Sequence, residues 1–176
     1  MLFIGRLQAR KRIDLLLLAC AALPPHLQPS LWIVGDGPAA EDAKAMAQRV
    51  YPRTEFFGAR HGIELEPFFE ADLFVLPGTG GLAVQEAMAH GLPVIVAEGD
   101  GTQDDLVRPG NGWLVPPGDL TALTQALQDA VTDVSRLRAM GWESYRIVEG
   151  EANLEKMVEV FVGLASQLTH PKERNP

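Results

Sequence analysis

The sequence has a single cysteine, Cys20, and no apolar run long enough to cross a membrane. One cysteine excludes an internal disulfide, so nothing in the cysteine content supports secretion. A transmembrane helix needs about 20 consecutive apolar residues, whereas the longest apolar run, 15–23, stops at a proline pair. We therefore expect no transmembrane segment. We also expect Cys20 to be an inert side chain on the buried face of a helix.

Positive charge is scarce as well. The chain has 15 Lys+Arg against 23 Asp+Glu, which gives a formal net charge of -8. This balance argues against binding to nucleic acid, which needs a basic surface. An anionic ligand would have to be held by a local pocket rather than by the overall field. No group of His, Cys, Asp and Glu has the spacing of metal ligands, so we expect neither a metal site nor a cofactor.

The 176 residues, 47% of them hydrophobic, fit one globular domain. Short apolar segments alternate with segments whose apolar residues recur at helical spacing, which is typical of a parallel sheet buried on both faces. We therefore predict a doubly wound, Rossmann-like α/β fold of about six strands with helices on both faces. The predicted strands are 2–7, 31–34, 55–57, 73–76, 93–97 and 113–115. The predicted helices run from Ile13 to the proline pair, over 38–50, 63–70, 82–90 and 135–145, after a cap at Asp119, and from about Asn153.

Ligands of such sheets bind beyond the carboxyl ends of the strands. The segment PGTGG, 77–81, follows the fourth strand, and its glycines would let backbone N–H groups approach an anion closely. Arg6 and Lys11 follow the first strand and would close the other side of a diphosphate. The alternative is a glycine turn that only makes the bend, with Arg6 and Lys11 on solvated surface. Spacing alone does not separate these two interpretations.

Three further features admit a structural and a functional interpretation. Segment 35–40, GDGPAA, nominally fits a dinucleotide fingerprint, but Glu55 precedes the apolar part of its strand, so we favour a plain strand-turn-helix junction. Glu86 is either a surface glutamate or a carboxylate that accepts hydrogen bonds from ribose hydroxyls, and its apolar neighbours suggest incomplete solvation. His61 lies in a glycine-bounded loop, as loop surface or as a ligand contact.

Taken together, four stretches resemble the C-terminal, donor-binding half of the family 4 (group 1) retaining glycosyltransferases of the GT-B fold. The resemblance covers nearly the whole chain, and the third stretch is highly specific because order, spacing and neighbours all agree. The stretches are FIGRLQARKRIDLLLLA (3–19), LWIVGDGP (31–38), ADLFVLPGTGGLAVQEAMAHGLPVIVAEGDG (71–101) and NGWLVPPGD (111–119).

The resemblance implies a site for a nucleoside diphosphate sugar. Arg6 and Lys11 match the family's pair that stabilises the leaving diphosphate, and Glu86 matches the glutamate that binds the ribose hydroxyls. The turn before Glu86 matches the backbone that meets the distal phosphate, and the loop after the third strand matches the backbone that meets the base. The donor-binding positions implied in these two segments are Gly78, Thr79, Gly80, Gly81, Leu82, Ala59 and Arg60.

Two positions depart from the family pattern. The family usually has a second glutamate eight residues before the ribose-binding one, and this chain has Gly78 there. The family usually has glycine after the lysine, and this chain has Arg12. We expect Arg12 to be tolerated. Gly78 removes a carboxylate from beside the donor sugar, which suggests altered sugar contacts or a weakened enzyme.

The implied function is transfer of a sugar, of the hexosyltransferase type, from a nucleoside diphosphate sugar to an acceptor hydroxyl. Alternatives are a non-catalytic nucleotide-sugar-binding module and, with a poorer match, a GT-B sugar-nucleotide epimerase. Family members pair two domains across a cleft. We therefore expect residues 1–169 to form the donor domain, 170–176 a disordered tail, and an absent N-terminal acceptor domain to be the partner. The fragment alone would be inactive, and the location cytoplasmic, either free or peripheral at the inner membrane face.

Overall fold

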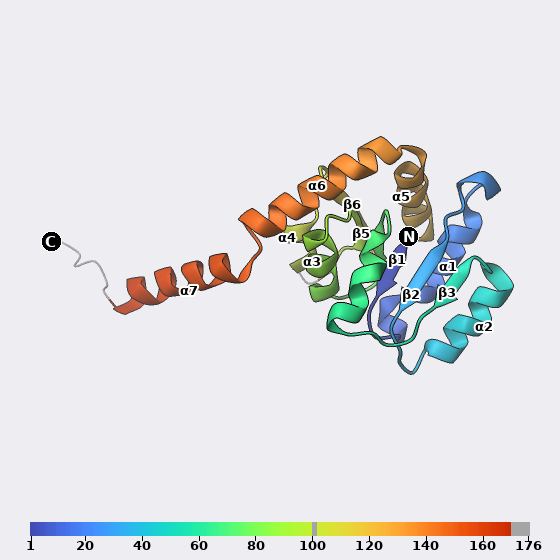
Figure 1. Cartoon of the computed structure of the whole chain (residues 1–176), viewed down its shortest axis with the longest axis horizontal. Coiled ribbons are helices and arrows are strands. Elements are labelled where there is room, and N and C mark those ends of the chain that lie inside the picture. The colour runs from blue at the N-terminus through green and yellow to red at the C-terminus, as the bar shows by residue number, and fades with distance from the viewer. Residues whose placement is uncertain (100–101, 170–176) are drawn as a thin grey trace.

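The computed structural model describes residues 1–99 and 102–169 (Figure 1). Within them, six parallel strands form one sheet in the order β3-β2-β1-β4-β5-β6, so the predicted fold class is confirmed. The expected tail at 170–176 lies outside the described residues. The strands are β1 (Leu2–Ile4), β2 (Leu31–Val34), β3 (Thr54–Phe56), β4 (Phe74–Leu76), β5 (Val94–Ala97) and β6 (Gly112–Val115).

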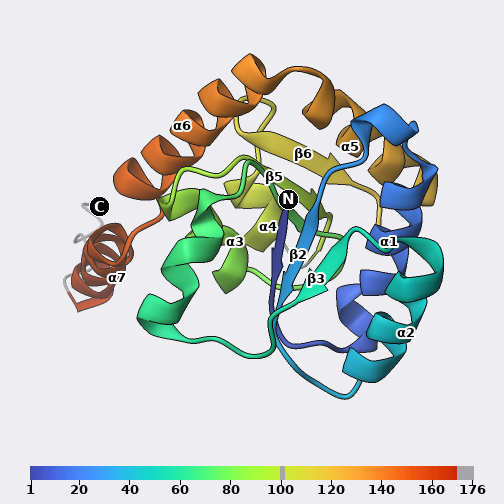
Figure 2. The same ribbon diagram turned by 45° about the vertical axis from the view of Figure 1, so that its right-hand side comes forward.

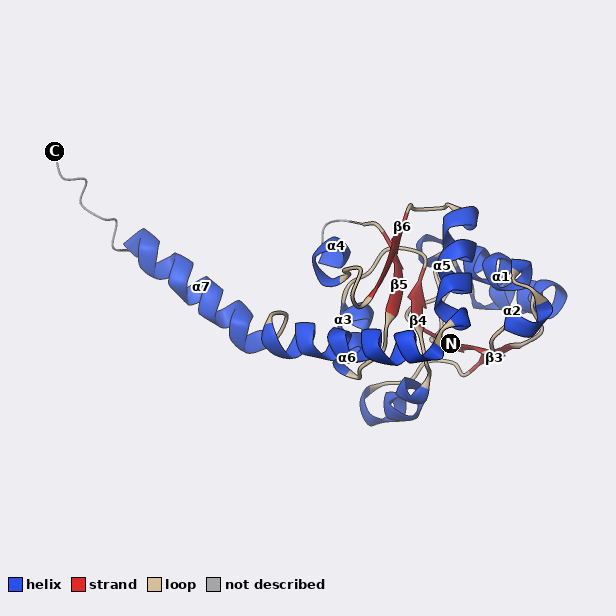
Figure 3. Cartoon of the chain, turned by 90° about the horizontal axis from the view of Figure 1, so that it is seen from above, coloured by secondary structure: helices blue, strands red, loops and turns tan. Residues whose placement is uncertain are grey.

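Helices cover both faces of the sheet. On one face α1 packs against α2 and α5, whereas α3 and α4 lie on the other (Figures 1 and 3). Helix α6 leaves α5 and packs on α3 at that other face (Figure 2). The α-helices are α1 (Ile13–Ala22), α2 (Ala40–Val50), α3 (Leu82–Ala89), α4 (Thr102–Leu106), α5 (Leu120–Thr132), α6 (Val134–Gly150) and α7 (Leu154–Thr169). The 3-10 helices are η1 (Ala9–Lys11), η2 (Pro25–Leu27) and η3 (Gly62–Glu70).

Most predicted elements are present with shifted ends. Asp119 caps α5 as expected, because its carboxylate accepts a hydrogen bond from the Ala122 N–H at 2.9 Å. The predicted helix at 135–145 is too short, since α6 continues to Gly150. Helix α4 was not predicted, and the segment predicted as an ordinary helix at 63–70 is the 3-10 helix η3.

The sheet opens where its strand order reverses. Strand β1 pairs with β2 along its whole length, but with β4 it shares only the pair Leu2–Phe74. The two central strands therefore separate toward their carboxyl ends. This is the place where open α/β sheets bind ligands.

The glycines of the segment after β2 are needed for close packing. A Cβ at Gly35 would lie 1.9 Å from the carbonyl oxygen of Gly5, and one at Gly37 would lie 2.4 Å from that of Leu7. The loop after β1 also donates from the Leu7 N–H to the Asp36 carbonyl at 2.9 Å. These contacts account for both glycines without a dinucleotide, in agreement with the plain junction favoured above.

Helices α1 and α7 differ sharply in the burial of their apolar side chains. On α1, Cys20 is fully buried, and burial raises the pKa of its thiol to about 12, as expected for an inert core cysteine. Helix α7 instead projects from the body of the domain (Figures 1 and 3). Its side chains Leu154, Met157 and Phe161 are 65%, 63% and 73% exposed.

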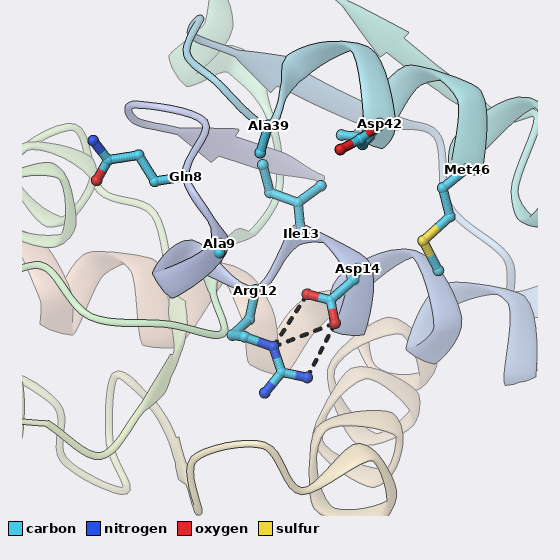
Figure 4. Close-up of a pocket in the computed structure, with 9 residues that line it drawn as sticks. Gln8, Ala9, Arg12, Ile13, Asp14, Ala39, Asp42 and Met46 are labelled. Carbon is cyan, nitrogen blue, oxygen red and sulfur yellow. Dashed lines mark hydrogen bonds and ion pairs between the residues drawn. The ribbon is translucent and has the colours of Figure 1, made fainter.

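Arg12 has a strained backbone. It joins η1 to α1 with φ 54° and ψ 44°, in the left-handed region that favours glycine. Its guanidinium donates to both carboxylate oxygens of Asp14 beside a groove between α1 and α2 (Figure 4). This geometry explains why the family usually has glycine here, and the tolerance of Arg12 stays a prediction.

At position 12, we expect R12G to be more stable than R12A by about 1 kcal/mol, because only glycine adopts this backbone without strain. Both variants remove the ion pair with Asp14, so their difference isolates the backbone. At Arg10, which has no positive φ, the order should reverse, with R10A the more stable. Urea unfolding of the four variants measures this, and an R12A as stable as R12G would contradict it.

Candidate functional site

Lys11 reaches from the loop after β1 into the turn after β4. Its side chain is buried, and its ammonium group donates a hydrogen bond to the carbonyl oxygen of Thr79. A Cβ at Gly80 would lie 2.3 Å from the Lys11 nitrogen, so glycine leaves room for the ammonium. Tertiary structure thus brings together a cation and a glycine turn that are far apart in the sequence.

The turn leads directly into the N-terminus of α3. Gly81 is the N-cap residue, and no side chain caps the helix. The first N–H groups of a helix have no partner within it, and the helix dipole favours an anion there. Leu82, the first helical residue, is 85% exposed, so the end of the helix is open. Together with Lys11, this turn can bind a phosphate group.

The environment of Lys11 weakens its hold on its proton. Burial lowers the pKa of the Lys11 ammonium below its ordinary value, and the neighbouring Arg10 charge lowers it further. An anion bound at the turn would act in the opposite direction, because it favours the charged ammonium. Lys11 is therefore a buried cation that, beyond its hydrogen bond to Thr79, would gain from an anionic ligand.

Gly78 has no room for a side chain. A Cβ there would lie 2.1 Å from the carbonyl oxygen of Arg10 and 2.6 Å from the Lys11 Cα. The next residue, Thr79, donates its N–H to the same Arg10 carbonyl at 3.2 Å. The turn after β4 thus packs backbone to backbone on the turn after β1. The glutamate usual in the family does not fit this arrangement.

A separate group of predicted residues lines a cavity of about 520 Å³ beyond β1, β2 and β3. It contains Arg6 together with Ala59 and Arg60, the segment expected to meet the base. It also contains Asp36, from the segment predicted as a plain strand-turn-helix junction, and His61, predicted as either loop surface or a ligand contact. The cavity is lined by Ile4, Gly5, Arg6, Val34, Gly35, Asp36, Gly37, Ala59, Arg60, His61 and Leu65.

Asp36 and His61 each have a local structural partner. The Asp36 carboxylate accepts the N–H of Gly37 at 2.7 Å. His61 forms a capping box with Glu64 at the start of η3. Both are exposed, so these local roles leave them accessible from the cavity. The sequence signal for both was their place in a loop that follows a strand.

Glu86 lies on α3, beyond the glycine turn, and is exposed. The expectation of incomplete solvation is therefore wrong. Its helix turns it outward, while Ala87 and Met88 pack in the core. Its role toward ribose stays a prediction, as do the donor-binding roles of Arg6 and Lys11.

The family described as glycosyl transferases group 1 matches residues 1–133 of the chain. The chain belongs to this family.

Relatives of this group 1 chain are considerably longer. A GDP-mannose-dependent alpha-mannosyltransferase of Mycobacterium tuberculosis is 38% identical over 133 residues, 73% of this chain and 32% of that protein. Sucrose-phosphate synthase from Thermosynechococcus elongatus superposes with a TM-score of 0.82 at 31% identity, covering 96% of this chain and 45% of that one. Anabaena Alr3699/HepE, solved with UDP, has the same fold, with a TM-score of 0.82 at 22% identity over 94% and 48% of the two chains. The chain thus spans about a third to a half of the length of these relatives.

Two kinds of feature were also sought in all the described residues of this group 1 chain: a membrane-spanning helix and a metal site. None of its helices combines the length and the apolar character of a membrane span. Within the same described residues, no cluster of His, Cys, Asp and Glu is arranged to hold a metal ion.

We expect G78A to lower the free energy of unfolding by about 2 kcal/mol or more, since the methyl group meets backbone that cannot rotate away. G78E should be at least as unstable, and it should not supply the family's usual carboxylate. G150A is the matched control, because a Cβ at Gly150 meets nothing within 4 Å. Urea unfolding measures all three, and a G78A as stable as the wild type would show that the two turns are not in contact.

Proposed function

We propose that the chain is the donor-binding half of a retaining glycosyltransferase that moves a sugar from a nucleoside diphosphate sugar to an acceptor hydroxyl. The observation that carries the proposal is the buried ammonium of Lys11 over Gly80, at the uncapped N-terminus of α3. A buried cation beside open backbone N–H groups suits a phosphate group better than it suits a neutral ligand. Membership of the group 1 family supports the same substrate class.

In this proposal, the cavity beyond β1, β2 and β3 and the turn that holds Lys11 bind different parts of the nucleotide. The cavity lined by Arg6, Ala59 and Arg60 takes the base. Arg6 is also proposed to bind the diphosphate. Lys11 and the N–H groups of the turn take the distal phosphate. Glu86, exposed on α3, accepts hydrogen bonds from the ribose hydroxyls.

The chemical contribution of this half is electrostatic. As the bond from the sugar to the diphosphate breaks, negative charge develops on the leaving diphosphate. In this proposal, Lys11, Arg6 and the turn N–H groups stabilise that charge, which lowers the barrier. We propose that these groups do the work without a metal ion.

A non-catalytic nucleotide-sugar-binding module is the second candidate. It is favoured by Gly78, because the close contact with Arg10 leaves no space for a carboxylate beside the sugar. Both candidates share the nucleotide site, so binding alone does not separate them. Sugar transfer by the complete protein does.

The complete protein is proposed to include an acceptor domain. The exposed apolar side chains of α7, among them Met157 and Phe161, would pack on that domain. The matched relatives are about two to three times as long as this chain, which leaves room for it. A cytoplasmic location belongs to the same proposal and rests on the family resemblance.

We expect the chain to bind GDP or UDP, and K11A to weaken that binding by about 10- to 100-fold, the usual value of a hydrogen bond to a charged group. GDP is tested because the mannosyltransferase relative is GDP-mannose-dependent, and UDP because a structural neighbour was solved with it. E86A should lose about tenfold. Isothermal titration calorimetry measures each, with K44A, which alters an exposed ion pair on α2, as the control. A wild-type chain that is folded and binds neither nucleotide would refute the site.

The affinity for the nucleoside diphosphate should fall at alkaline pH. Because burial lowers the pKa of Lys11, the charged form that binds phosphate is complete below that pKa and is lost as pH rises through it. The loss should begin below the range where an ordinary lysine titrates, about pH 10. K11R keeps its charge throughout, so its affinity should change less over about pH 7 to 9.5. Parallel pH profiles for the two proteins would contradict this.

A further inference from the structure

Gln103 is a polar side chain buried beneath the site. It belongs to α4, after β5, and is only 1% exposed. Its amide nitrogen donates a hydrogen bond to the carbonyl oxygen of Gly78 at 3.2 Å. Of the other buried polar residues in the described chain, Asn111 and Ser144 bond to each other at a different place. Among the described residues, Gln103 and Lys11 are thus the two buried polar side chains that bond to the turn after β4.

The other half of the Gln103 amide is unpaired. Its Oε1 atom is buried and has no hydrogen-bond partner among the described residues. A Cβ at Gly99 would lie 2.0 Å from this oxygen, so Gly99 is the residue that lets the amide sit here. A methionine or leucine would fill similar space without burying an unpaired oxygen. Packing alone therefore does not explain an amide at this position, whereas the bond to Gly78 does.

The bond lies one residue away from the contact that holds Lys11. Gly78 receives the Gln103 amide on its carbonyl and packs against Arg10 and Lys11 on its Cα side. The carbonyl oxygen of Thr79, the next residue, accepts a hydrogen bond from the Lys11 ammonium. The Gly78–Thr79 segment is thus held by Gln103, which follows β5, on one side and by Lys11, which follows β1, on the other. Its orientation sets both Lys11 and the N–H groups that follow.

We propose that Gln103 is a positioning residue for the distal phosphate of the nucleotide. By holding the Gly78 carbonyl, it orients the turn so that the Lys11 ammonium and the N–H groups of Gly80 and Gly81 converge on one phosphate. The inference rests on the donor-binding function proposed above. It adds a residue that does not touch the nucleotide but determines how well the diphosphate is bound.

The test separates the distal phosphate from the rest of the nucleotide. The dissociation constants of GDP and GMP, or of UDP and UMP if the wild type binds those, are measured for the wild type and Q103M. The ratio of the monophosphate constant to the diphosphate constant reports the contribution of the distal phosphate. Q103M should lower this ratio about tenfold, the effect of losing one well-oriented bond to a charged group. The monophosphate constant should stay unchanged.

Two further variants exclude a general loss of structure. Q28M is the matched control, since Gln28 likewise donates its amide to backbone carbonyls, those of Ala21 and Leu23, near the amino ends of the strands. Its ratio should equal that of the wild type. G99A places a methyl group against Oε1 and should displace the Gln103 amide at little cost in stability. It should lower the ratio as Q103M does, and it should have no further effect when combined with Q103M.

Each outcome has one meaning. A lowered ratio in Q103M and G99A, with unchanged monophosphate binding and unchanged amide chemical shifts away from the turn, supports the proposal. An unchanged ratio in folded Q103M overturns the role of Gln103 and leaves the donor site intact. If Q103M does not fold, G99A decides by the same ratio. A wild type that binds none of the four nucleotides overturns the donor site itself, and the role of Gln103 with it.

Discussion

The backbone contact between the turn after β1 and the turn after β4 is the constraint on which the site depends. Gly78 lies so close to Arg10 and Lys11 that no Cβ fits between them. Strands β1 and β4 are parallel neighbours in the sheet, so the turns that follow them lie at the same edge. This contact places Lys11 against Thr79 and Gly80, so that the buried charge of Lys11 lies near the start of α3. A cation, a glycine turn and a helix N-terminus thus lie together, an arrangement that suits an anion.

The same contact explains in physical terms why this chain has Gly78 where the family usually has a glutamate. In this chain the position is closed by the Arg10 carbonyl and bonded to Gln103. A glutamate could not be added by changing this residue alone, since the backbone on both sides would have to move. The local arrangement is therefore an alternative packing of the turn, with its own buried amide. It is more than the loss of one side chain.

The electrostatics of the domain are local. The chain carries a formal net charge of -8, yet the carboxyl end of β1 is followed by Arg6, Arg10 and Lys11. Burial makes Lys11 the costliest of these charges to keep without an anion. At the opposite extreme, α7 leaves large apolar side chains in solvent. Both features fit the proposal that a phosphate binds at one place and an apolar surface of another domain at the other.

The fold class follows from the sequence, because strands such as 31–34 and 74–76 are wholly apolar and alternate with helical patterns. The sequence also predicted the Asp119 cap, a local interaction between neighbouring residues. It placed Lys11 and the glycine turn at strand ends, and so at one edge of the sheet. Four features emerge only when the chain is folded: the Lys11 ammonium bonds to Thr79, Gly78 admits no side chain, Glu86 points outward and Gln103 is buried. These facts depend on the exact approach of loops that are distant in sequence, which leaves no periodicity or local preference in the sequence to read.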